Sequence, residues 1–306
     1  MEEIAMKIRR LLILLMRMLN PDPLSKITKD LPKIDVMIPV AAKDLFLLES
    51  VIQHLHRNCR NPIQNIFVVT PEKKYVNLDS RNSLIVINDA DFLDIDLVKF
   101  KLEHPDVYGW SVQQLIKIKA VHFTKEKYLL WLDSDTLLNA KRTFVDNEYI
   151  LEIISDEYHR PYFRGLKKTL NLKAKFLRLS RVSHHAVVDV KTFQLFEAQN
   201  NIKSEFDWKE IILNAVNEKE KNSNMAWYIF GNESFSEYEM NSLILKKFNI
   251  SRKLAYWWNE SRSTYSNNLN YIEVERGLLE KFSEWKRPEK PYSISFHSWR
   301  LKQNDL

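Results

Sequence analysis

Glycine is scarce in this chain of 306 residues. Four glycines are present, and no two of them lie close together in the sequence: Gly109, Gly165, Gly231 and Gly277. A dinucleotide-binding loop of the G-x-G-x-x-G type and a Walker-type phosphate loop both need several glycines within a few residues. The spacing therefore excludes both kinds of loop.

Cysteine and long apolar runs are scarcer still. Cys59 is the only cysteine, which excludes an intramolecular disulfide framework and a cysteine-rich zinc site. A chain of this kind suits a reducing compartment, and we expect a cytoplasmic protein. The apolar run near the N-terminus, within residues 6–19, is shorter than the ~20 residues that span a bilayer.

The first twenty residues nevertheless form a distinct segment. Residues 6–19 read MKIRRLLILLMRML, and the following Asn-Pro-Asp-Pro offers no small-residue cleavage site of a signal peptide. We predict a basic and apolar helix in residues 1–20, and its role has two alternatives. The helix either lies on the inner face of a membrane, or docks on the domain or on a second copy in a homodimer. Prolines make residues 21–33 a linker, so the main domain is residues 34–306.

The charge balance is only mildly basic. Lysine and arginine number 46 against 40 acidic residues, for a net charge of +6. The chain therefore lacks the large excess of basic residues that is typical of a nucleic-acid-binding protein, and we expect no nucleic-acid partner. Residues 160–182 carry eight basic residues and no carboxylate, which is either a solvated face or a surface for an anionic partner.

Apolar runs and helical periods alternate along the first half of the domain. We predict four strands, at residues 34–40, 65–70, 83–87 and 128–132, with helices at residues 43–57 and 111–123. Alternation of this kind predicts an α/β fold, a mostly parallel sheet with helices on both faces. The second half is less regular, with helices expected at 146–158, 208–220 and 237–248 and a strand at 183–190.

Two carboxylates follow the fourth predicted strand. Asp133 and Asp135 are two residues apart, so in an extended segment they project to the same side. Two like charges that close are costly without a cation between them. Mg²⁺ or Mn²⁺ would resolve that cost through oxygen ligands. The alternative is that Asp133 caps a turn and Asp135 is solvated.

Several motifs together resemble those of the GT-A glycosyltransferases, and more narrowly a bacterial family of nucleotide-sugar glycosyltransferases. They are GWSVQQ at residues 109–114, LDSD at 132–135, SEYE at 236–239 and a late histidine, His297. The resemblance covers residues 34–299. It implies a Rossmann-like sheet, with residues 34–140 binding a nucleotide-sugar and residues 141–306 facing the acceptor.

The resemblance also implies roles for individual residues. Asp133 would lie near the ribose and the metal, Asp135 would ligate the metal, and His297 would complete the metal site. His297 lacks the glycine and the Lys-Pro-Trp that follow this histidine in glycogenin-like enzymes, and its alternative is a buried core residue. The nucleotide base would lie near the ends of the first and third strands, at Val40, Lys43, Asp89 and Asp91.

Two helices supply the remaining candidates. Gln114 and Lys117 share a helical face, where they would bind the nucleotide and its diphosphate. The alternative is that they lie on the solvent-exposed side of a surface helix. Ser236 and Glu239 form a capping-box pattern, which leaves Glu237 as a general base for an inverting transfer. The alternative for Glu237 is to complement the helix dipole.

Two adjacent histidines, His184 and His185, lie on a predicted strand. Their rings should point to opposite faces of the sheet, because side chains alternate along a strand. At most one ring can therefore face the site, and we expect neither to ligate a metal.

The expected function is that of an enzyme. It would use Mn²⁺ or Mg²⁺ to move a sugar from a nucleotide-sugar donor, by default a UDP-sugar, to a glycan or lipid-linked acceptor in bacterial surface polysaccharide assembly. Whether transfer inverts or retains configuration is open. One alternative is a metal-dependent phosphoryl-transfer enzyme, and another is a non-enzymatic module that binds nucleic acid or a membrane through basic residues.

Overall fold

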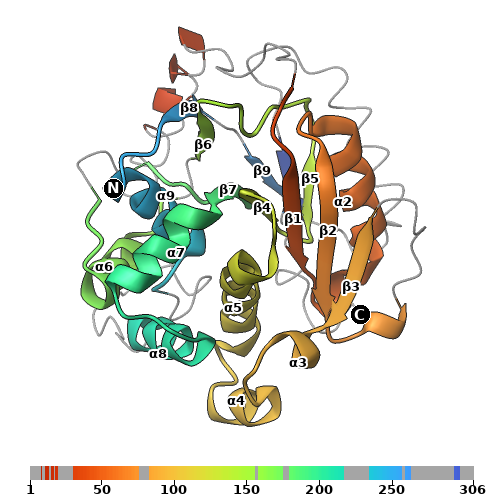
Figure 1. The fold of residues 1–306 in the computed structure, drawn as a ribbon, viewed down its shortest axis with the longest axis vertical. Helices are drawn as coiled ribbons and strands as arrows, with labels where there is room; N and C mark the ends of the chain where they lie inside the picture. Colours follow the sequence, from red (N-terminus) through yellow and green to blue (C-terminus); the bar gives the residue numbers. More distant parts are fainter. Residues whose placement is uncertain are drawn as a thin grey trace.

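The computed structural model describes residues 30–75, 83–155, 158–174, 179–216, 234–256, 259–262 and 293–296, together with residues 8, 11–13, 15, 16, 18 and 19. The described chain is an α/β fold built on one mostly parallel sheet flanked by helices (Figure 1).

The central sheet has five strands in the order β3-β2-β1-β4-β7. These strands are β1 (Ile34–Pro39), β2 (Ile63–Thr70), β3 (Leu84–Asn88), β4 (Tyr128–Leu132) and β7 (His185–Asp189). The first four run parallel to one another, and β7 runs antiparallel to β4. The sequence prediction of a mostly parallel α/β sheet is therefore confirmed. Because β7 belongs to the second half of the chain, both halves contribute to one sheet.

Helices and two small sheets complete the described fold. The α-helices are α2 (Leu45–Asn58), α3 (Asp89–Phe92), α4 (Leu97–Glu103), α5 (Tyr108–Phe123), α6 (Arg160–Leu170), α7 (Val190–Gln199), α8 (Glu205–Val216) and α9 (Glu237–Lys247), with 3-10 turns at Ala42–Asp44 and Lys73–Tyr75. The small sheets join β5 (Thr136–Leu138), β10 (Ser293–Phe296) and β9 (Asn259–Arg262) in one, and β6 (Ile150–Ile154) with β8 (Arg252–Tyr256) in the other.

Both faces of the central sheet are covered, as Figure 1 shows. Val36 and Ile38 of β1 belong to a core with Leu55 and other residues of α2. Met37, between them in sequence, belongs to the opposite core together with Leu115 of α5 and residues of α7 and α9. A strand buried on both faces needs an apolar residue at every position. This requirement explains why the predicted strands read as continuous apolar runs.

Two sequence predictions of helices differ from the structure. The described part of residues 146–158 contains no helix, because Ile150–Ile154 is strand β6, buried at all five positions and paired with β8. Its β-branched residues favour a strand, but its partner β8 was not predicted. Helix α5 begins at Tyr108, three residues before the predicted start at residue 111.

The described positions from 8 to 19 are helical, in keeping with the helix predicted there. Among the helices of the described residues, none is both long enough and apolar enough to cross a membrane.

Candidate metal centre

The carboxyl end of β4 meets the start of β7. The two strands are antiparallel and pair Leu132 with His185, so the residues just beyond that pair, Asp133 and His184, are also neighbours. The backbone N–H of Asp133 donates to the carbonyl of His184 at 2.9 Å. Ligands of open α/β sheets commonly bind beyond the carboxyl ends of the strands, and Asp133 occupies that position.

Among the described residues, Asp133, Asp135 and His184 form a group whose side chains lie close enough together to hold a metal ion. One potential ligand atom from each lies within 4.8 Å of the others. The segment is a turn, in which the N–H of Thr136 donates to the carbonyl of Asp133 at 3.2 Å. The prediction of an extended segment is therefore wrong in detail, but the turn still brings the two carboxylates together.

His184 is the member of this group that the sequence did not predict as a ligand. Its backbone lies in the left-handed region, with φ of 61°, and its Nδ1 is 3.0 Å from Oδ2 of Asp133. With the proton on Nδ1, the ring donates to that carboxylate, and Nε2 is then the nitrogen whose lone pair can bind a metal. The expectation that neither histidine ligates a metal stays a prediction, but the position of His184 beside both aspartates speaks against it.

His185 faces different surroundings. It is the first residue of β7, whereas His184 precedes the strand with a left-handed backbone, so the predicted alternation of both histidines along one strand is wrong. Its ring packs edge-on against Phe144, and its Nδ1 lies 2.6 Å from the carbonyl of Ser183. Burial lowers the pKa of His185 to about 3. His185 is therefore a neutral core residue.

Lys117 of α5 is the buried cation of the site. Its Nζ contacts Oδ1 of Asp133, lies 2.5 Å from Oε1 of Glu237 and donates to the hydroxyl of Tyr238 at 2.8 Å. Burial by itself would lower the pKa of Lys117, but the two carboxylates raise it above its ordinary value. Lys117 is therefore a charged group inside the fold. The alternative, that it lies on the solvent-exposed side of a surface helix, is wrong.

Asp133 is the acceptor on which this network converges. Besides Lys117, the hydroxyl of Tyr238 and the amide of Gln113 donate to its Oδ1, at 2.8 Å and 3.1 Å. Burial would raise the pKa of Asp133, but Lys117 and His184 hold it well below its usual range. Gln113 lies in the GWSVQQ motif, next to the predicted candidate Gln114.

The first turn of α9 differs from its prediction in two respects. The carboxylate of Glu237 is not free, because it pairs with Lys117. The backbone N–H of Glu237 donates to Oε1 of Gln114 at 3.0 Å. Ser236 caps the helix through the N–H of Glu239 at 3.3 Å, which is half of a capping box. The carboxylate of Glu239 instead accepts from the hydroxyl of Ser180 at 2.8 Å.

The other predicted site residues are at the ends of β1 and β3 or beyond the described chain. Val40 is buried directly after β1, and Lys43 is exposed in the following 3-10 turn. Asp89 and Asp91 open α3, where Asp89 is buried and Asp91 is exposed. His297 lies outside the described residues.

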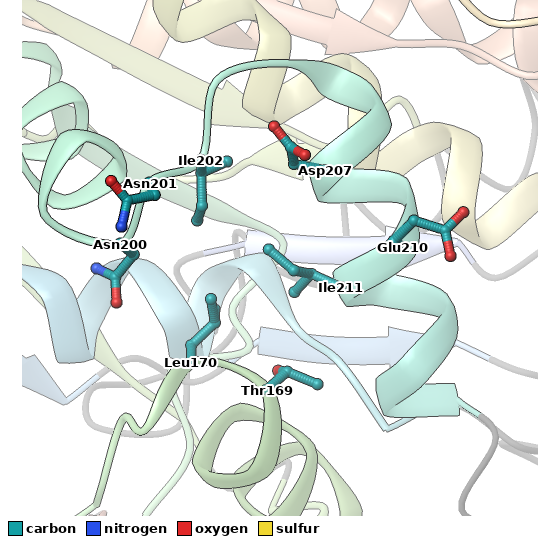
Figure 2. Close-up of a pocket in the computed structure, with 8 residues that line it drawn as sticks. All are labelled: Thr169, Leu170, Asn200, Asn201, Ile202, Asp207, Glu210 and Ile211. Atoms are coloured by element: carbon teal, nitrogen blue, oxygen red, sulfur yellow. The ribbon is translucent and has the colours of Figure 1, made fainter.

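A hollow of about 320 Å³ lies elsewhere, between the end of α6, residues 200–202 and α8 (Figure 2). Asp207 in its lining accepts from the backbone N–H groups of Lys203 and Ser204, at 2.8 Å and 3.0 Å. This carboxylate therefore fixes the start of α8. None of the three candidate metal ligands lines this hollow.

Comparison with known proteins places the chain in one family. The model of a family of unknown function, DUF6492, matches residues 33–289. No curated protein matches the chain. Because the match covers most of the sequence, including the carboxyl end of β4 and the first turn of α9, the chain belongs to the DUF6492 family.

Proposed function

We propose that this protein is a metal-dependent glycosyltransferase of the GT-A class, which transfers a sugar from a nucleotide-sugar to a glycan or lipid-linked acceptor. One observation carries the proposal: Asp133, Asp135 and His184 bring their ligand atoms within 4.8 Å of one another directly beyond β4. An Asp-x-Asp pair at the end of a strand of a Rossmann-like sheet is the feature on which the resemblance to these enzymes rests.

The residues present suit a divalent cation. Two carboxylates and an imidazole form a donor set that Mn²⁺ accepts, and oxygen ligands suit Mg²⁺. Lys117 pairs with both Asp133 and Glu237, so one positive charge is shared between two carboxylates. When bound, a divalent ion would neutralise the diphosphate of the departing nucleotide.

The chain's own residues would hold Asp133 ready for this role. Lys117, Tyr238 and Gln113 all donate to Oδ1, so the orientation of the carboxylate is fixed and Oδ2 lies beside His184. Rigid support of this kind reduces the reorganisation needed when charge develops in a reaction. Glu237 helps by anchoring Lys117, and we assign it this positioning role in preference to that of a free base.

The donor's nucleotide would lie along the same edge of the sheet. Val40 and Lys43 follow β1, and Asp89 and Asp91 follow β3, so all four belong to the carboxyl edge at which Asp133 lies. We propose that this edge receives the base and ribose. A ligand role for His297 stays a prediction from the resemblance alone.

Thermal-shift measurements with UDP, GDP and CMP, each with and without Mn²⁺, test the proposal. We expect one nucleotide to raise the melting temperature only when the metal is present, and Asp135→Asn to abolish this rise. Asp106→Asn, which removes an exposed carboxylate between α4 and α5, is the matched control and should behave as wild type. Stabilisation by oligonucleotides but by no nucleotide would contradict the proposal and favour a binding module.

A further inference from the structure

The helix near the N-terminus presents apolar side chains to solvent. Six of its described residues are large, apolar and at least 41% exposed: Ile8, Leu11, Leu12, Leu15, Met18 and Leu19. Ile13, in contrast, is only 3% exposed. Elsewhere in the described chain, exposed apolar residues are scattered singly or in pairs, as with Val98 and Leu102 on α4, and such scatter is normal on a protein surface.

The six exposed residues form one stripe. An α-helix turns by about 100° per residue, so positions 8, 11, 12, 15, 18 and 19 fall within an arc of about 120°. Position 13 falls on the opposite side of the same wheel. The helix therefore has one apolar side that faces away from the buried Ile13, and the stripe is about 17 Å long at 1.5 Å per residue.

The charge of the segment indicates what covers the stripe. Residues 6–19 contain Lys7, Arg9, Arg10 and Arg17 and no acidic residue. A short helix that combines an apolar stripe with basic residues is typical of segments that lie in the interface of a membrane with anionic lipids. The apolar run within residues 6–19 is shorter than the ~20 residues that span a bilayer, so we infer that the segment lies along the surface.

We propose that the helix within residues 6–19 docks the protein on an anionic lipid bilayer, with the stripe inserted among the headgroups. This inference is independent of the metal centre, because it rests on other residues. It places the protein at the surface on which a lipid-linked molecule would be found.

Vesicle co-sedimentation of the full chain tests this. Wild type should bind vesicles of phosphatidylcholine mixed with phosphatidylglycerol far better than vesicles of phosphatidylcholine alone, and added salt should weaken the binding. The double variant Leu11→Gln/Leu15→Gln should lose about tenfold or more in affinity, because two apolar side chains no longer enter the lipid. Val98→Gln/Leu102→Gln, an equally spaced and more exposed pair on α4, is the matched control and should bind as wild type.

Three outcomes would overturn the proposal. The first is a wild-type chain that does not bind the anionic vesicles. The second is an equal loss of vesicle affinity in the two double variants. The third is a wild-type chain that light scattering shows to be a dimer and that Leu11→Gln/Leu15→Gln makes monomeric. The last would assign the stripe to a second copy of the chain.

A second variant, Arg10→Gln/Arg17→Gln, leaves the stripe intact and should weaken binding to the anionic vesicles only. Equal thermal melting of the variants and wild type shows that any loss of binding is not a loss of folding.

Discussion

Lys117 and Glu237 form an ion pair whose side chains are only 1% and 3% exposed, with 2.5 Å between Nζ and Oε1. The pair joins the middle of α5 to the first turn of α9, and Lys117 extends it to Asp133 at the end of β4. Taking charges out of water is expensive, so a buried pair is weak evidence of added stability. Removing one member, however, leaves the others uncompensated.

Lys117→Met should therefore be strongly destabilising. Two buried carboxylates, Asp133 and Glu237, would lose their cation, and breaking a buried pair in this way costs about 3–5 kcal/mol. Urea unfolding measures the loss. Lys99→Met is the control, because Lys99 pairs with Glu103 in an exposed i,i+4 arrangement worth about 0.5 kcal/mol or less. Equal effects of the two substitutions would show that the Lys117 network is not desolvated.

Substitution of the candidate ligands should weaken metal binding. We expect Asp135→Asn and His184→Gln each to lower the affinity for Mn²⁺ by about tenfold or more, since each removes one ligand of the group. Isothermal titration calorimetry on the metal-free protein measures this without reference to any activity. His104→Gln, at the end of α4, should leave the affinity unchanged. A wild-type affinity in His184→Gln would place the third ligand elsewhere, with His297 the first residue to examine.

The sheet could be predicted because its determinants are local. An apolar run such as residues 128–132 favours a strand buried on both faces wherever its neighbours lie, and the structure has β4 at those residues. Strand β6 was missed because its partner β8 lies about a hundred residues away, paired from Ile150 with Arg252. A short apolar run without a visible partner does not distinguish a strand from a helix.

The site was only partly predictable for a similar reason. The two aspartates are neighbours in sequence, so their convergence could be seen. The pairing of Lys117 with Glu237 spans 120 residues, and no spacing rule reveals it. His184 reaches Asp133 through the antiparallel register of β7 on β4, which a sequence does not encode in any short motif.

Glu239 should make stability depend on pH. Burial raises the pKa of its carboxyl from an ordinary value of 4.5 to about 7 in the fold, so the folded state binds a proton that the unfolded chain has released. Below pH 4.5 Glu239 is protonated in both the folded and the unfolded state, and its contribution to the free energy of unfolding is complete. As the pH rises from 4.5 to 7, this contribution is lost, by about 3 kcal/mol in all.

The variant Glu239→Gln isolates this contribution, because glutamine imitates the protonated side chain at every pH. Urea unfolding of both proteins from pH 4 to 8 should show wild type losing stability relative to the variant as the pH rises, with a constant difference above about pH 7. Other titrating groups, such as His185, are common to both proteins and cancel. Two parallel curves would contradict the raised pKa.

Gly165 sets how closely α6 approaches the segment that leads into α9. A Cβ atom at this position would lie 1.8 Å from the carbonyl oxygen of Ser234, and because that atom is backbone, a helix or the segment before Glu237 must move. We expect Gly165→Ala to cost about 1–3 kcal/mol in urea unfolding, as overpacking does. Gly109→Ala in α5 is the control, since nothing lies within 4 Å of the added Cβ, and it should stabilise the protein by up to about 1 kcal/mol. The first turn of α9 carries Glu237, which pairs with Lys117 and so supports Asp133. Gly165→Ala should therefore also lower the affinity for Mn²⁺, and Gly109→Ala should leave it unchanged. An unchanged affinity in both variants would show that Asp133 keeps its orientation when Glu237 moves.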